Sequence, residues 1–314
     1  MLSRRRFLGA LPLLSGALVG CEKETPPARH QYPEQPLEVV TSTVQAADLI
    51  RQIGGNAVMV RSLIPPEENP NQWQPVATDF VTLQIADVFF LSGLGLESRI
   101  AEDLHKLSKR GVRFGGLADA LLETDILLRP DGKPDPHFWM DPLLWAKAAK
   151  KAALILSEAA PPSAFLFQDR AHEFAIALEK VHDSILKQMN GLPSEKRFAF
   201  TSHDSLAYFA AAYGLETRSL CGADGALPVK ISPDLETWLT DHKIGHFFRD
   251  QSTKRESFSA MLAPLTLNDN YQIFSLSLAK PGTMFAGIAG ELAVDACLPA
   301  LQYTADLIAG RLAL

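Results

Sequence analysis

The chain has 314 residues, of which 47% are hydrophobic and 21% are charged, and its formal net charge is −6. These values fit a folded globular protein of about two domains and exclude a disordered or fibrous chain. The acidic balance provides no basic surface for DNA or RNA, so we expect no nucleic-acid partner. Three cysteines without C-x-x-C spacing exclude a disulfide scaffold and a cysteine zinc motif.

Residues 1–21 predict an export signal with a lipidation site. Arg4, Arg5 and Arg6 precede an apolar run at 8–19, which is shorter than the about 20 residues of a membrane span. The basic cluster resembles the twin-arginine export signal, and residues 18–21 (LVGC) resemble the lipobox of bacterial lipoproteins. We therefore expect a lipid on Cys21 and an exported protein that is anchored to a membrane and faces the periplasm or the cell exterior. The alternative is a simple secretion signal with an incidental cysteine.

The next segments predict a tether and a first α/β lobe. Residues 22–36 are polar and proline-rich, which is typical of an extended tether. Strands are expected at 37–43, 58–64 and 87–92, with helices at 44–53 and 79–86 between them. Strands that alternate with helices indicate a mainly parallel sheet, so we expect an N-terminal α/β lobe over 37–160.

A long amphipathic segment separates this lobe from a second one. Residues 163–189 contain no proline or glycine and carry apolar side chains at helical spacing, which predicts a helix about 40 Å long. A helix of this length suits a spine between two lobes, and we place the linking segment at 161–192. In the C-terminal lobe, 193–314, strands are expected at 197–201, 245–248 and 272–276, with helices at 206–213, 233–242, 254–262 and 291–312. The expected fold class is therefore α/β: two lobes with mainly parallel sheets, one spine helix and an interlobe cleft.

Two histidines carry the pattern of a ligand site. His137 lies in the segment 135–142 (DPHFWMDP), where two aspartates are close enough to orient its imidazole, as is common for metal ligands. His203 lies in 201–204 (TSHD), at the carboxyl end of an expected strand, where α/β proteins bind their ligands. Two such histidines in separate lobes suggest a shared metal site in the cleft.

The sequence resembles the zinc/manganese solute-binding proteins of bacterial ABC importers from about residue 37 to the C-terminus. The matching segments are 44–55, 62–66, 93–97 (GLGLE), 135–142, 201–204 and 281–283. The resemblance implies two α/β lobes on one long helix, four side chains that hold a divalent zinc or manganese ion as transported ligand, and delivery to the permease of a metal importer. We expect a monomer without enzymatic activity.

The resemblance also implies that two of the four metal ligands are replaced. Asn71 stands where the family has its first histidine, and Leu276 stands in place of the family's acidic ligand. An amide oxygen is a poor zinc ligand and leucine is none. His137 and His203 remain as the expected metal ligands, and other residues that could line the site are Asp204, Asp250, Glu67 and Glu68.

Three alternatives to metal import stay open from the sequence. The lost ligands would also suit a binding protein for a metal chelate or another small solute. A metal-assisted hydrolase that uses His137 and His203 is less favoured, because the chain lacks the G-x-S-x-G, H-E-x-x-H and G-x-x-x-x-G-K-[ST] motifs. A surface adhesin is the third. A disulfide between Cys221 and Cys297 also stays open, since both cysteines belong to an exported chain.

Overall fold

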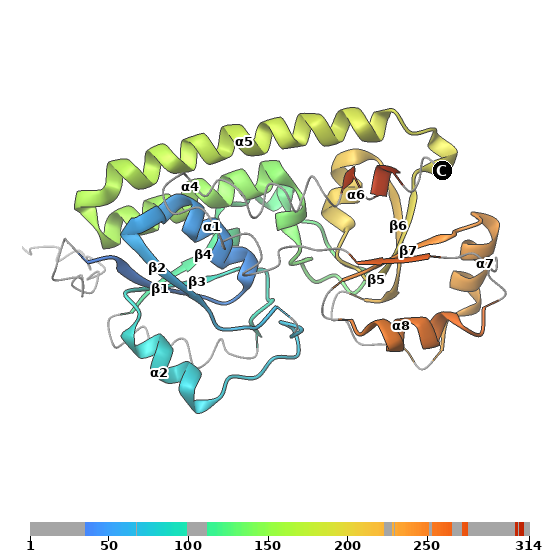
Figure 1. Cartoon of the computed structure of the whole chain (residues 1–314), viewed down its shortest axis with the longest axis horizontal. Coiled ribbons are helices and arrows are strands. Elements are labelled where there is room, and N and C mark those ends of the chain that lie inside the picture. The colour runs from blue at the N-terminus through green and yellow to red at the C-terminus, as the bar shows by residue number, and fades with distance from the viewer. Residues whose placement is uncertain are drawn as a thin grey trace, which may run out of the picture.

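The structure, a computed structural model, describes residues 35–66, 68–98, 112–222, 228, 230–250, 253–265, 272–275, 305–306 and 308–310. The expected signal peptide with Cys21, nearly all of the tether, and most of the expected helix at 291–312 lie outside these residues. So do Glu67, Leu276 and Cys297. The described residues form two α/β lobes that lie side by side under one long helix (Figure 1). The expected fold class is therefore confirmed.

The N-terminal lobe is built on a parallel sheet with the strand order β2-β1-β3-β4. Its strands are β1 (Leu37–Thr41), β2 (Val58–Ser62), β3 (Val88–Leu91) and β4 (Arg113–Gly116), and its helices are α1 (Val44–Gly54), α2 (Ala77–Ile85) and α4 (Pro142–Ala159). Val39 and Val40 point to opposite faces of β1 and enter different apolar clusters. Both faces of this sheet are therefore covered, by α1 and α4 on one side and α2 on the other (Figure 1).

The C-terminal lobe repeats this construction with the strand order β6-β5-β7-β8, again all parallel. Its strands are β5 (Phe198–His203), β6 (Glu216–Cys221), β7 (His246–Arg249) and β8 (Gln272–Ser275), and its helices are α6 (Ala207–Tyr213), α7 (Pro233–Asp241) and α8 (Arg255–Leu262). Phe200, Phe247 and Phe258 pack on the face that α7 and α8 cover. The centre of each sheet is thus shielded from water, as parallel sheets require.

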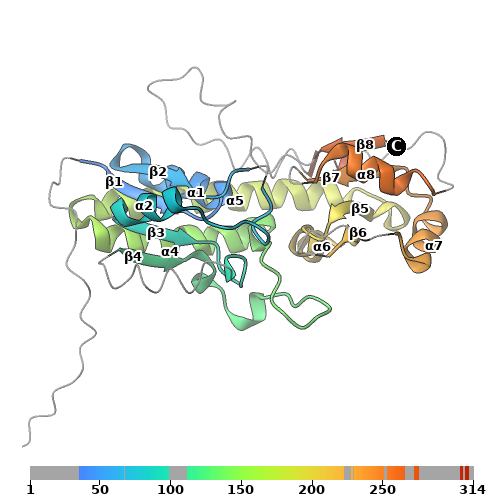
Figure 2. The ribbon, with the colours of Figure 1, turned by 90° about the horizontal axis from the view of Figure 1, so that it is seen from below.

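The spine is α5 (Ala164–Asn190), an uninterrupted helix of 27 residues that passes over both lobes (Figure 2). One apolar cluster continues along it from the first lobe into the second, and its buried members include Leu156, Phe167, Leu178, Ile185 and Phe209. Among the described residues, no helix combines the length and apolar character needed to cross a membrane. The spine and the shared core together hold the carboxyl ends of the two sheets at one cleft.

A buried glutamate fixes the strand ends that border this cleft. Oε1 of Glu97 accepts hydrogen bonds from Ser42 Oγ at 2.5 Å and from the backbone N–H of Ser92 at 2.7 Å, and Oε2 accepts from the backbone N–H of Gly93 at 3.1 Å. Ser42 follows β1, and the other two follow β3. The carboxyl group therefore ties together the ends of β1 and β3, which the backbone N–H of Ser42 also joins by donating to the carbonyl of Phe90.

Replacing Glu97 by glutamine is expected to change how stability depends on pH. Burial raises the pKa of the Glu97 carboxyl, although its hydrogen bonds oppose the shift. The folded state then keeps a proton that the unfolded chain releases near its pKa of about 4.3. The contribution of Glu97 to stability is therefore full below that value and falls as the pH rises through the folded-state pKa. Urea unfolding at several pH values should show the parent losing stability relative to Glu97→Gln as the pH rises.

The exposed Glu123 offers a matched control, because Glu123→Gln changes an acid at the surface. A difference between parent and Glu97→Gln that is constant from about pH 4 to about pH 7 would contradict the expectation.

Candidate metal site

His137 and His203 reach the cleft from different lobes. His137 caps the 3₁₀ turn Phe138–Met140, directly before α4, whose N-cap is Asp141 and whose first residue is Pro142. His203 is the last residue of β5, where the sheet ends. The two imidazoles meet with Nε2 of His203 lying 3.1 Å from Nε2 of His137.

A buried carboxylate lies behind each imidazole. Nδ1 of His137 is 2.8 Å from Oδ1 of Asp135, and Nδ1 of His203 is 2.9 Å from Oδ2 of Asp250. Because a carboxylate oxygen accepts, we assign the ring proton of each histidine to Nδ1. Nε2 of each ring then turns a lone pair toward the other. This carboxylate–histidine arrangement orients imidazoles for metal binding.

The distance between the two Nε2 atoms suits a shared metal ion. A tetrahedral zinc ion with Zn–N bonds of about 2.0–2.1 Å holds two nitrogens about 3.3–3.4 Å apart. The observed 3.1 Å is only a few tenths of an ångström shorter. With both ring protons on Nδ1, the two Nε2 lone pairs face each other at this distance, and a cation between them would stabilise the pair.

Burial favours the neutral imidazole that a metal needs. Desolvation lowers the pKa of His137, and the facing His203 lowers it further, against the opposing effect of Asp135. Burial also raises the pKa of the Asp204 carboxyl, with a smaller effect from Asp135 in the same direction. A neutral His137 keeps its Nε2 lone pair available for a cation.

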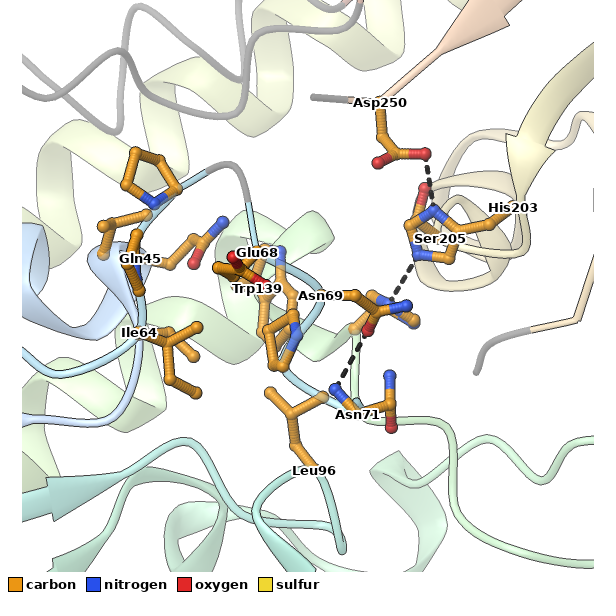
Figure 3. Close-up of a pocket in the computed structure, with 16 residues that line it drawn as sticks. Gln45, Ile64, Glu68, Asn69, Asn71, Leu96, Trp139, His203, Ser205 and Asp250 are labelled. Carbon is orange, nitrogen blue, oxygen red and sulfur yellow. Dashed lines mark hydrogen bonds and ion pairs between the residues drawn. The ribbon is translucent and has the colours of Figure 1, made fainter. Parts of the chain in front are cut away.

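The cleft contains a cavity of about 80 Å³ that both histidines line. Asn71, Glu68 and Asp250 also line this cavity, and Figure 3 shows His203, Ser205 and Asp250 on one side of it, with Gln45, Ile64 and Leu96 on the other. Glu68 is exposed. Asp204 instead lines a second, more open cavity of about 730 Å³ beside Arg129 and Arg218. The described residues contain no cluster of three or more His, Cys, Asp or Glu side chains able to hold a metal.

The Asp250 carboxylate accepts hydrogen bonds from several donors of its own lobe. Its Oδ2 accepts from Ser202 Oγ and from Thr253 Oγ1 at 2.9 Å, in addition to His203, and its Oδ1 accepts from the Thr253 backbone N–H at 3.2 Å. These contacts hold the carboxylate against the ring of His203. The Asp250 carboxylate thus orients the ring of His203, a contact that its place after β7 did not reveal in the sequence.

The two aspartates around His137 divide their roles. Asp135 orients the imidazole, whereas Oδ1 of Asp141 accepts from the backbone N–H of Leu143 and caps α4. Tyr208, which sequence reasoning missed, donates from its hydroxyl to the carbonyl of Asp135 and accepts from the backbone N–H of Leu127, both at 3.1 Å. Burial raises the pKa of Tyr208 to about 12. This hydroxyl ties the His137 loop to α6 of the other lobe.

Comparison with known proteins places the chain in a family. A family described as "Zinc-uptake complex component A periplasmic" matches residues 39–275. The manganese-binding lipoprotein MntA of Bacillus subtilis is 28% identical over 288 residues, which cover 89% of this chain and 93% of that protein. The zinc-binding protein TroA of Treponema pallidum is 27% identical over 226 residues, which cover 71% of this chain and 73% of that protein.

The fold agrees with this match. The solved structure of the periplasmic zinc-binding protein TroA from Treponema pallidum aligns with a TM-score of 0.78 at 24% identity, over 88% of this chain and 99% of that chain. This likeness concerns the arrangement of the two lobes and the long helix. With its family match over most of its length, the chain belongs to the periplasmic zinc-uptake component A family.

Proposed function

We propose that this chain is the extracytoplasmic solute-binding protein of an ABC importer and that its cargo is a divalent metal ion, with zinc preferred over manganese. The observation that carries the proposal is the pair of imidazoles with their Nε2 atoms 3.1 Å apart and a carboxylate behind each. The relatives named above are described as manganese-binding and zinc-binding, which supports a divalent metal as cargo.

The donor set favours zinc. Neutral imidazole suits zinc, copper, iron and nickel, whereas manganese prefers carboxylate, carbonyl and water oxygens. The carboxylates of Asp135 and Asp250 accept from ring nitrogens. The sequence resemblance implies that Asn71 stands where the family has a histidine and that Leu276 stands where it has an acid. We infer a site with two protein nitrogens, in which other ligands complete the coordination of the ion and the affinity is lower than in a four-ligand site.

The small cavity and the isolated serine argue against a large chelate as cargo and against a hydrolase that uses Ser205. Sites for drug-sized organic molecules occupy about 300–1,000 Å³, whereas the cavity at the two histidines has about 80 Å³. A large chelate is therefore disfavoured. Oγ of Ser205, in the same cavity, has no hydrogen bond to either imidazole, so Ser205 is not a nucleophile activated by these histidines. We infer a binding protein and not an enzyme.

Zinc titration by calorimetry tests the proposal on the mature chain. The parent is expected to bind one zinc ion, and His203→Ala is expected to lose this binding because one of the two nitrogen ligands is gone. His182→Ala is the matched control, since His182 lies on the spine and contacts the hydroxyl of Tyr213. Absence of binding in the parent, or equal losses in the two variants, would contradict a zinc site at His203.

Restoring the two replaced ligands should tighten zinc binding. Structural sites with four ligands gain about 10–16 kcal/mol in total, so each added ligand should raise affinity by about a hundredfold. The double variant Asn71→His with Leu276→Asp is expected to exceed either single variant in a competition titration with a zinc-binding dye. If the double variant binds no more tightly than the parent, the correspondence of these two positions to metal ligands is wrong.

We further propose that lipid on Cys21 anchors the protein to a membrane, facing the periplasm or the cell exterior, and that it delivers its metal to the permease as a monomer. Support comes from the apolar run and lipobox-like LVGC at residues 8–21, and from relatives described as lipoproteins.

Loss of the lipid should release the chain from membranes. In fractionated cells, Cys21→Ser is expected to move the protein from the membrane pellet to the soluble fraction, because one thiol carries the whole anchor. Cys221→Ser is the matched control and should stay in the pellet. Retention of the Cys21→Ser variant in the membrane pellet would contradict a lipid anchor on Cys21.

A further inference from the structure

Two buried side chains in the wall of the cleft cavity have polar atoms without a hydrogen-bond partner. Trp139 is 7% exposed and Ser205 is 1% exposed, and both line the cavity beside the two histidines. Nε1 of Trp139 and Oγ of Ser205 make no hydrogen bond. Buried polar groups are nearly always paired. These two atoms differ from the unpartnered Nε1 of Trp145 because they belong to residues that line the cavity, so a ligand in this cavity would pair them.

The chemistry of the two groups selects the missing partner. An indole N–H can only donate, and a serine hydroxyl readily donates. The ring of Trp139 lies edge-on to His137, with centroids 5.2 Å apart, so its N–H belongs to the surroundings of the imidazole pair. A partner that accepts from both groups must carry lone pairs, such as those of an oxygen atom.

The metal proposed above needs the same kind of partner. Two imidazoles leave a zinc ion short of the four ligands that it usually takes. The buried carboxylates nearest to the rings, Asp135 and Asp250, are occupied by Nδ1 atoms, and Asp204 lines the other cavity. An oxygen ligand from outside would fill the coordination shell and accept the two N–H and O–H donors.

We propose that the cleft binds its metal together with a small oxyanion of the carboxylate type. One oxygen binds the metal, and the other accepts from Nε1 of Trp139 and from Oγ of Ser205. The cavity of about 80 Å³ admits an anion of hydrogencarbonate or acetate size. This inference rests on the proposed metal-binding function and extends it to the species that the protein carries.

The test compares zinc affinity in three media of equal pH and ionic strength: hydrogencarbonate, acetate and chloride. Competition with a zinc-binding dye should give an affinity about tenfold higher in at least one oxyanion than in chloride. The oxyanion with the larger effect distinguishes an inorganic source from an organic carboxylate. Trp139→Phe and Ser205→Ala should each remove most of this difference between the media.

Trp145→Phe is the matched control. Nε1 of Trp145 is also buried without a hydrogen bond, but this side chain packs against Phe138 in the core and does not line the cavity. Trp145→Phe should keep the full oxyanion effect. Ser205→Ala removes a single oxygen, so it carries the test even if a tryptophan variant fails to fold, which thermal unfolding would reveal.

Binding of the oxyanion itself can be measured by NMR. The ¹³C resonance of labelled hydrogencarbonate or acetate should shift or broaden only when both zinc and the parent protein are present, and much less with Ser205→Ala. Equal zinc affinity in all three media would overturn the proposal that an oxyanion binds with the metal and would show that water fills the site. The proposed metal-binding function would stand. No zinc binding in any medium would overturn both proposals.

Discussion

Each imidazole of the cleft is held by a carboxylate that is itself out of reach of water. A buried carboxylate is costly unless donors surround it, and Asp135 and Asp250 each obtain one donor from a histidine Nδ1. With Nδ1 engaged, Nε2 is the only nitrogen that each ring can offer to the cleft. The facing of the two Nε2 atoms therefore follows from satisfying two buried charges.

The distance between the imidazoles depends on how the lobes are joined. A single apolar cluster continues from α4 of the first lobe along α5 to α6 of the second lobe. The hydroxyl of Tyr208 on α6 bonds to the loop that carries His137. Interiors packed in this way transmit displacement and resist gradual deformation. The spine thus sets the separation of the two lobes. The Tyr208 contact sets the position of the His137 imidazole relative to that of His203.

The sequence predicts the two lobes, the spine and the two histidines, because apolar periodicity and strand ends are local signals. We did not predict α4 from the sequence, although Asp141 and Pro142 form a typical helix start. We did not predict β6 either, because its alternate residues are exposed and give no apolar run. The role of Asp250 could not be predicted, because its partner His203 is 47 residues away in sequence. The partnerless Trp139 and Ser205 likewise become visible only when the lobes are folded together.

A crystal of the mature chain grown with zinc, measured at the zinc absorption edge, tests the central claim most directly. We predict one strong anomalous peak for a zinc ion, about 2.0–2.1 Å from Nε2 of His137 and from Nε2 of His203. Asp135 and Asp250 should still be bonded to the Nδ1 atoms. A peak bound through Nδ1, a peak bound to Asp204 or Glu68 without the histidines, or no peak at the cleft would contradict it.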